Sequence, residues 1–206
     1  MNCMSGWERM HPSQSLFMND GCYMCKTVSL DKYDNSWYHP GSAWKRLVWY
    51  FVNVSFLKNT FIPCSSLKVF LLRLFGAKIG RNVTIKPGVN IKYPWLLEVG
   101  NNCWLGENVW IDNLAHVKIG NNVCISQGAM LLCGNHNYKK ETFDLIIGEI
   151  ILEDGCWVGA KSVVCPGVTL AVNSVLSVCS VAQRNLEADR IYQGNPAREI
   201  RIRTIS

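Results

Sequence analysis

The chain has 206 residues, of which 49% are hydrophobic and 17% charged, and its formal net charge is +6. This composition excludes an intrinsically disordered chain, which would contain less apolar and more charged sequence. The length suffices for one substantial core with an appendage. The positive charge favours anionic partners such as nucleotides, a coenzyme or lipid headgroups, without selecting among them.

The first 27 residues are rich in methionine and turn-forming residues, and we expect them to form a flexible leader. They contain no signal peptide of the usual pattern, and Met24 is a plausible second start. Cys22 and Cys25 form a single CxxC without a second CxxC or a flanking histidine, which is a weak zinc signal. Most of the ten cysteines occur singly in apolar stretches, and we expect them to be reduced packing residues.

Residues 28–78 are predicted to form a helical N-terminal segment. Two apolar stretches, AWKRLVWYFVNVSFL and SSLKVFLLRLFG, are separated by Pro63, and neither reaches the roughly 20 residues needed to span a bilayer. The first stretch places aromatic residues beside Lys45 and Arg46, which is typical of a helix that lies on a membrane surface. A helical cap over the end of a β core, or a subunit contact, is the alternative interpretation.

From Ile79 onward the pattern changes to a repeat of six residues, which predicts a parallel β-solenoid over residues 79–182. Neither a helix nor a hairpin strand keeps a period of six on one face. Each hexapeptide would form one short strand and one corner, and three strands would close a coil that stacks about 4.8 Å from the next. The inward aliphatic positions are Ile79, Ile85, Ile91, Leu97, Val99, Leu105, Ile111, Val117, Ile119, Ile125, Leu131, Leu152, Val158, Val164, Leu170 and Leu176.

The repeat is interrupted at residues 133–150, CGNHNYKKETFDLIIGEI, where we expect a loop extruded from the solenoid. Before this loop the matched turns IGRNV, VGNNC and IGNNV begin 20 residues apart, and after it the coils shorten to 18. Corners of a solenoid can extrude loops without disturbing the stacked core, so functional residues collect there. Residues 183–206 are expected to form a C-terminal extension that packs on the coils.

The segments FLLRLFGAKIG, YPWLLEVGNNCWLGENVWIDNLAHVKIG, CISQGAMLLCGNHNY, DGCWVGAKSVVCPGVTL and YQGNPAREI resemble the hexapeptide-repeat acyltransferases, in particular O-acetyltransferases of colanic-acid-type exopolysaccharide biosynthesis. The resemblance extends from about Val28 to the C-terminus. It implies a mainly β fold, a left-handed parallel β-helix, although general chain physics favours right-handed crossovers. It also implies a homotrimer with active sites between subunits.

By this resemblance, His136 in GNHNY is the catalytic base. An imidazole titrates near pH ~6.5, so it is suited to remove a proton from a sugar hydroxyl at neutral pH. The hydroxyl oxygen can then attack a thioester, and no cysteine or serine intermediate is needed. His116 lies 20 residues earlier, one long coil before His136, and is expected at the rim of the site rather than as a second catalytic group.

Asp112 and Asn113 in WIDNL occupy a corner that, by resemblance, faces the acceptor, and they are assigned to hydroxyl binding. The alternative is that Asp and Asn simply form a good turn.

The resemblance places the pantetheine arm of acetyl-CoA along a groove between subunits, against Gly159 and Ala160. Arg184 and Arg198 are expected to approach the phosphates of the coenzyme, as suits a polyanion. The alternative is that both arginines are solvated.

The sequence therefore predicts an acetyl-CoA-dependent O-acetyltransferase acting on a saccharide hydroxyl in surface-polysaccharide biosynthesis, cytoplasmic and with a peripheral contact to the membrane. No metal and no nucleic-acid partner are expected. Two alternatives stay open: a non-catalytic β-helical assembly subunit, and a zinc hydratase resembling gamma-class carbonic anhydrase. The second requires three histidine ligands, whereas the solenoid segment has only His116 and His136.

Overall fold

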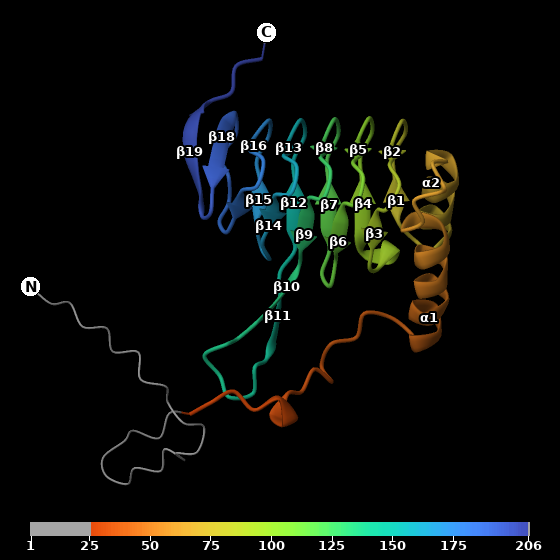
Figure 1. Cartoon of the computed structure of the whole chain (residues 1–206), viewed down its shortest axis with the longest axis vertical. Helices are drawn as coiled ribbons and strands as arrows, with labels where there is room; N and C mark the ends of the chain where they lie inside the picture. The colour runs from red at the N-terminus through yellow and green to blue at the C-terminus, as the bar shows by residue number, and fades with distance from the viewer. Residues whose placement is uncertain (1–25, 206) are drawn as a thin grey trace, which may run out of the picture.

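The computed structural model describes residues 26–205 as a β-solenoid with two helices across one end (Figure 1). Residues 1–25, which hold the Cys22 and Cys25 pair and almost all of the expected leader, lie outside the described residues. The predicted mainly β fold of parallel stacked coils is confirmed.

The helical cap is shorter than the predicted segment 28–78. It contains α1 (Ala43–Val52), continued by the π-type turn η2 (Asn53–Leu57), and α2 (Ser65–Leu74). The helix begins after Ser42, whose side chain accepts a hydrogen bond from the backbone N–H of Lys45. Residues 28–42 contain the short turn η1 (Leu30–Lys32) and a second turn at Ser36 and Trp37, and are otherwise irregular or extended. Pro40 and Gly41 disfavour a helix that runs through them. The two apolar stretches of the predicted segment are the parts that form these helices.

Three parallel sheets form the faces of the solenoid, and each coil contributes one strand to each face (Figure 1). Sheet A contains β1 (Lys78–Ile79), β4 (Leu97–Val99), β7 (Val117–Ile119), β12 (Ile150–Leu152) and β15 (Thr169–Leu170). Sheet B contains β2 (Thr84–Ile85), β5 (Trp104–Leu105), β8 (Cys124–Ile125), β13 (Trp157–Val158) and β16 (Val175–Leu176). Sheet C contains β3 (Asn90–Ile91), β6 (Trp110–Asp112), β9 (Met130–Leu132), β14 (Val163–Val164) and β17 (Val181–Ala182).

The register confirms the predicted coil lengths. Ile79 pairs with Val99 and Val99 with Ile119, 20 residues apart, whereas Leu152 pairs with Leu170 after 18. The predicted inward positions are all buried and form one continuous core. Asn102 and Asn122 turn the corners with φ of 57°, a left-handed conformation that asparagine tolerates better than most residues, which explains the repeated GNN turns.

Two hairpins extend the solenoid. The expected loop at 133–150 is an antiparallel hairpin of β10 (Gly134–His136) and β11 (Leu145–Ile147), which leaves between β9 and β12. At the other end β18 (Arg190–Gly194) adds to sheet B beside β16, and β19 (Ala197–Ile202) pairs with β18. The last corner before sheet A in the first coil contains the short turn η3 (Pro94–Leu96). No helix within residues 26–205 is long and apolar enough to cross a bilayer.

Candidate active site

His136 ends β10 and lies on the hairpin that projects from the solenoid (Figure 1). Its Nδ1 atom is 3.0 Å from the backbone carbonyl oxygen of Phe143, on the returning side of the hairpin. A carbonyl oxygen only accepts, so this contact assigns the proton to Nδ1 and leaves the lone pair on Nε2. The imidazole is thus held in the tautomer that a general base requires.

Phe143 contacts the imidazole a second time through its ring. The two rings stack with centroids 4.3 Å apart and planes 5° apart. Phe143 has a φ of 49°, which is unusual for a bulky residue and costs on the order of 1–2 kcal/mol. This conformation is sustained by a hydrogen bond from the Phe143 N–H to the carbonyl oxygen of Lys140. Local strain that orients the histidine is typical of a functional site.

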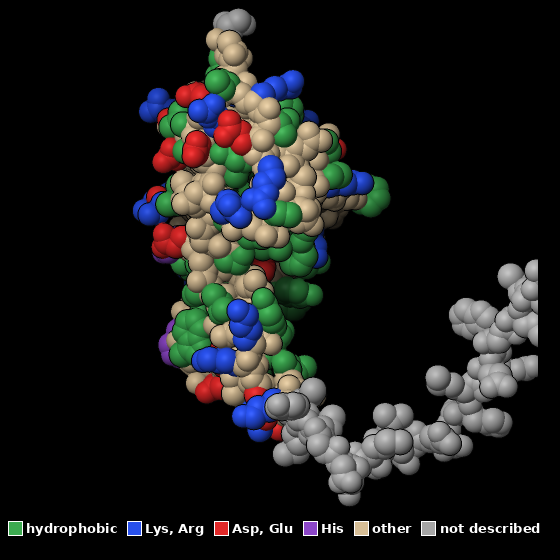
Figure 2. Space-filling model, turned by 90° about the vertical axis from the view of Figure 1, so that its left-hand side faces the viewer, with side chains coloured by type: hydrophobic (Ala, Val, Ile, Leu, Met, Phe, Trp, Pro, Cys, Tyr) green, Lys and Arg blue, Asp and Glu red, His purple; other side chains and the backbone are tan. Residues whose placement is uncertain are grey.

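The extended residues 26–41, here called the strap, run along the hairpin (Figure 1). The backbone N–H of Ser29 donates to the carbonyl oxygen of Glu141 at 2.9 Å, and Lys32 forms an ion pair with the Glu141 carboxylate. The ring of Tyr33 lies 5.6 Å from that of His136. The strap and hairpin together make a lobe that projects from the solenoid (Figure 2).

The strap is anchored to the solenoid at its other end. The Tyr38 hydroxyl donates to the carbonyl oxygen of Leu114 at 2.6 Å, and the Trp95 indole donates to that of Pro40 at 2.7 Å. Burial, followed by the nearby Tyr93 and Asp112, raises the pKa of Tyr38 far above its ordinary value. The sequence analysis missed the strap, although the aromatic run in KYDNSWYHP is a signal that pointed to a packed segment.

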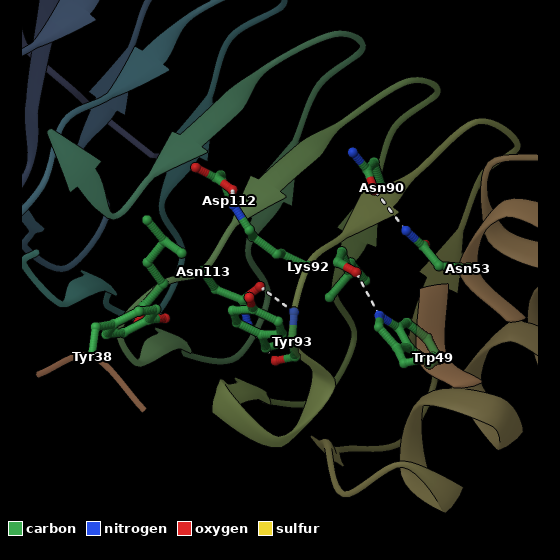
Figure 3. A network of polar contacts seen from close by, with 10 residues as sticks. Tyr38, Trp49, Asn53, Asn90, Lys92, Tyr93, Asp112 and Asn113 are labelled. Carbon is green, nitrogen blue, oxygen red and sulfur yellow. Dashed lines mark hydrogen bonds and ion pairs between the residues drawn. The ribbon is translucent and has the colours of Figure 1, made fainter. Parts of the chain in front are cut away.

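Asn113 is fully buried, and its side chain bridges two coils (Figure 3). The backbone N–H of Tyr93 donates to its Oδ1 at 3.0 Å, and its Nδ2 donates to the carbonyl oxygen of Tyr93 at 2.6 Å. The side chain predicted to bind a hydroxyl is therefore buried, and both ends of its amide are already hydrogen-bonded. These contacts fit the alternative interpretation, in which Asn113 serves to form the turn.

Asp112 has partial access to solvent and lies beside Lys92 in the preceding coil (Figure 3). Its Oδ1 is 2.9 Å from Nζ of Lys92, but the ammonium is not aligned to donate a hydrogen bond to that oxygen. We regard this contact as an ion pair without a hydrogen bond. Oδ1 of Asp112 is therefore engaged by the Lys92 charge.

His116 lies just before β7, and its backbone oxygen accepts from the N–H of Ile150 at 3.1 Å. It lines a hollow of about 580 Å³ at the base of the hairpin with Tyr38, Trp95 and Ile147. Its Nδ1 is buried without a hydrogen-bond partner among residues 26–205. This places His116 at the base of the hairpin that carries His136.

Gly159 and Ala160 follow β13 at the corner between sheets B and C. The N–H of Gly159 donates to the carbonyl oxygen of Leu176 at 2.7 Å, and a Cβ on Gly159 would lie 2.6 Å from the backbone nitrogen of Val178. Only glycine fits such a close approach of two coils. Gly159 is therefore required by the close stacking of these two coils, and it is buried between them.

Arg184 follows β17 and Arg198 lies in β19, and both are exposed. The end of the solenoid where they lie mixes basic and acidic side chains (Figure 2). The hairpin with His136 leaves the solenoid at the corner between sheets C and A, after β9 and before β12. Gly159 lies at the corner between sheets B and C. Within one chain, the predicted base and the predicted coenzyme corner therefore lie on opposite sides of sheet C.

Cys133 immediately precedes the hairpin and is fully buried. Burial raises the pKa of its thiol to about 11, so the thiol stays protonated near neutral pH. It is therefore unsuited to act as a nucleophile. Within the described part of the chain, no three histidine, cysteine or acidic side chains gather to hold a metal ion.

Comparison with family models gave no match. The chain is 36% identical over 166 residues to an Escherichia coli protein provisionally named a colanic acid biosynthesis acetyltransferase, covering 81% of this chain and 91% of that protein. It is 28% identical over 134 residues to the E. coli galactoside O-acetyltransferase, covering 64% of this chain and 66% of the relative.

Among solved structures, a hexapeptide-repeat acetyltransferase of Vibrio cholerae in complex with acetyl-CoA superposes with a TM-score of 0.72 at 21% identity, covering 81% of this chain and 93% of that one. A galactoside acetyltransferase in complex with coenzyme A superposes with a TM-score of 0.68 at 24% identity, covering 77% and 80%. At these identities the structures establish the shared fold.

Proposed function

Because this chain belongs to the hexapeptide-repeat acetyltransferases, the family of its colanic-acid-type relative, we propose that it transfers the acetyl group of acetyl-CoA to a saccharide hydroxyl during surface-polysaccharide biosynthesis. The coenzyme acts as a co-substrate. The single observation that supports this chemistry most is the imidazole of His136, held by the carbonyl oxygen of Phe143 with its Nε2 lone pair available.

In the proposed mechanism, Nε2 of His136 accepts the proton of the acceptor hydroxyl as the oxygen attacks the thioester carbonyl. A C–O bond forms and the carbonyl oxygen becomes an oxyanion, which backbone N–H groups stabilise. The oxyanion collapses with cleavage of the C–S bond, and the imidazolium returns its proton to the departing coenzyme A thiolate. The contact of Nδ1 with Phe143 serves both protonation states, since Nδ1 donates in each.

The coenzyme is proposed to lie against Gly159 and Ala160, with Arg184 and Arg198 near its phosphates. Ala160 is partly exposed at this corner, beside the buried Gly159, and its small side chain leaves room for a narrow pantetheine arm. Both arginines are exposed and available to a polyanion. These assignments rest on the family motif.

We propose that the protein forms a homotrimer, in which His136 of one subunit faces the coenzyme groove of its neighbour. Assembly would thereby bring the hairpin corner of one subunit to the Gly159 corner of the next. The outer face of sheet B carries exposed Trp104 and Trp157, apolar surface that a partner subunit would cover. Light scattering should then give about three times the chain mass of 23.3 kDa. A stable monomer with full activity would contradict the proposed subunit arrangement.

For the acceptor, we propose that the partly exposed carboxylate of Asp112, beside Lys92, accepts a hydrogen bond from a hydroxyl. We assign Asn113 a structural part in this corner, because both ends of its amide bind Tyr93. The acceptor is a saccharide, by analogy with the names of the relatives.

The helical cap is proposed to hold the cytoplasmic enzyme at the membrane surface. The side of α1 opposite the buried Trp49 is apolar, with Trp44, Leu47 and Phe51 all exposed. Residues 42–75 contain no aspartate or glutamate, so the charges beside this surface are basic. An exposed aromatic and aliphatic face with basic neighbours fits the interface of an anionic bilayer.

The test is to incubate the purified protein with acetyl-CoA and a pool of cell-surface saccharides, and to follow thiol release together with the mass of the products. The proposal predicts saccharides heavier by one acetyl group, with an ester that hydroxylamine removes. Thiol release without acetylated saccharide would contradict the acceptor class, and no thiol release would favour the non-catalytic assembly role.

A further inference from the structure

A groove of about 330 Å³ runs between the cap and the outer face of sheet C. Its walls come from α1 and η2 on one side and from β3 and β6 on the other, and Figure 3 shows Asn53, Asn90, Lys92 and Asp112 along it. The residues that matter for its chemistry are Arg46, Asn53, Lys58, Lys92, Trp110 and Asp112. None of the coenzyme residues lies in it.

The groove is positively charged. Arg46 and Lys58 form no ion pair with any residue in the range 26–205, and Lys92 is the partner of Asp112. Three cations therefore face one carboxylate. Arg46 supplies a planar fork of donors and Lys58 a movable ammonium, a combination that suits the oxygens of a phosphate ester.

The same groove also holds one acceptor oxygen that lacks a donor. Asn53 is 7% exposed; its Nδ2 donates to Oδ1 of Asn90 at 2.7 Å, while its own Oδ1 has no partner among the described residues. The Asp112 carboxylate beside it is paired with Lys92 through Oδ1 and is partly exposed. An unpaired buried acceptor is costly, and a ligand hydroxyl supplies the missing donor. Trp110, which is 41% exposed, offers a ring face to a sugar.

We propose that this groove binds a saccharide that carries a phosphate or diphosphate ester. Arg46 and Lys58 contact the phosphate, and Asn53 and Asp112 accept hydrogen bonds from sugar hydroxyls. The inference rests on the proposed function and specifies its acceptor. The groove ends near the base of the hairpin, because the backbone oxygen of Asp112 accepts from the N–H of Cys133, one residue before β10 begins.

A phosphorylated saccharide can be attached to a lipid or to a nucleotide. Tyr50 and Val54 line the groove and are also exposed beside the apolar face of α1. A lipid-linked saccharide would place its phosphate in the groove and its chain along this apolar face. A nucleotide sugar has the same phosphate chemistry without the apolar chain.

The test is calorimetric titration of the full chain with glucose and with glucose 1-phosphate. Tighter binding of glucose 1-phosphate is expected, together with a decline at high salt. The double variant Arg46→Gln, Lys58→Gln should lose affinity for the phosphorylated sugar by about tenfold per cation. The control Lys118→Gln, Lys139→Gln removes the same charge from outside the groove and should bind as the parent does.

Equal binding of the two sugars, or equal losses in both double variants, would overturn the inference. Farnesyl diphosphate and UDP-glucose distinguish a lipid attachment from a nucleotide attachment. Competition of either compound with glucose 1-phosphate supports binding in the groove, and the compound that binds more tightly identifies the attachment. Thiol release from acetyl-CoA with the saccharide pool is measured separately. Thiol release without preference for the phosphorylated sugar would contradict the phosphate site alone, whereas absence of thiol release would contradict the proposed acetyl transfer.

Discussion

The coils and the lobe of strap and hairpin are built by different rules. In the coils, backbone hydrogen bonds repeat from strand to strand, and an aliphatic residue at every sixth position is buried. In the lobe, β10 and β11 pair only with each other, and much of the order comes from side chains of the distant strap. The comparison teaches that the repeat supplies rigidity, whereas the interruption supplies the chemical groups and depends on contacts far apart in sequence.

The largest effect on stability should come from the coils. Ile111→Ala in β6 removes a fully buried side chain and should lower the free energy of unfolding by about 2–5 kcal/mol. Ile146→Ala in β11 removes a side chain that is 47% exposed and should lower the free energy of unfolding by less than about 1 kcal/mol. Urea titrations of both variants measure the difference, and equal losses would erase the contrast between coils and hairpin.

Asn113→Ala tests the corner between these regions. It removes two hydrogen bonds to Tyr93 and leaves buried backbone groups unpaired, so the free energy of unfolding should fall by about 1–3 kcal/mol. The measurement is thermal unfolding beside turnover at saturating acceptor. Full stability combined with a raised KM for the acceptor would contradict the structural part assigned to Asn113.

Phe143→Gly should separate activity from stability. Glycine adopts the positive φ without strain, so the melting temperature should stay the same or rise, while loss of the ring stack should lower kcat about tenfold through a less well-oriented His136. Phe143→Leu retains a bulky side chain and serves as the control for size. Undiminished kcat in the glycine variant would remove Phe143 as a positioning residue.

The smallest effect is expected from the strap. Lys32→Glu places like charges beside Glu141 and should weaken the lobe by about 0.2–1 kcal/mol, since the pair is partly exposed. The exchanged double variant Lys32→Glu, Glu141→Lys should recover the loss. The measurements are the rate of limited proteolysis of the lobe and the value of kcat. If the exchanged variant recovers neither the proteolysis resistance nor the kcat of the parent, the ion pair does not hold the strap.

The sequence was sufficient to predict the coils, because burial of one side chain in six is a local, repeated rule that Ile79 through Leu176 obey. It also predicted the loop that carries His136, since the interruption is visible against the repeat, whereas the role of His136 was a prediction from the family resemblance. It did not reveal the strap over His136, because Lys32 and Glu141 are far apart in sequence and neither has a local pattern. Asn113 was assigned to the acceptor because the sequence does not distinguish an exposed corner amide from a buried one.

The central claim is that His136 acts as the base while the coenzyme binds elsewhere on the solenoid. The most direct test is calorimetric titration of acetyl-CoA into the parent and His136→Ala proteins, followed by thiol release with the saccharide pool. The account predicts equal binding, with turnover lowered about 10²–10⁴-fold in the variant. Turnover that survives the substitution, or the absence of acetyl-CoA binding by the parent, would contradict it.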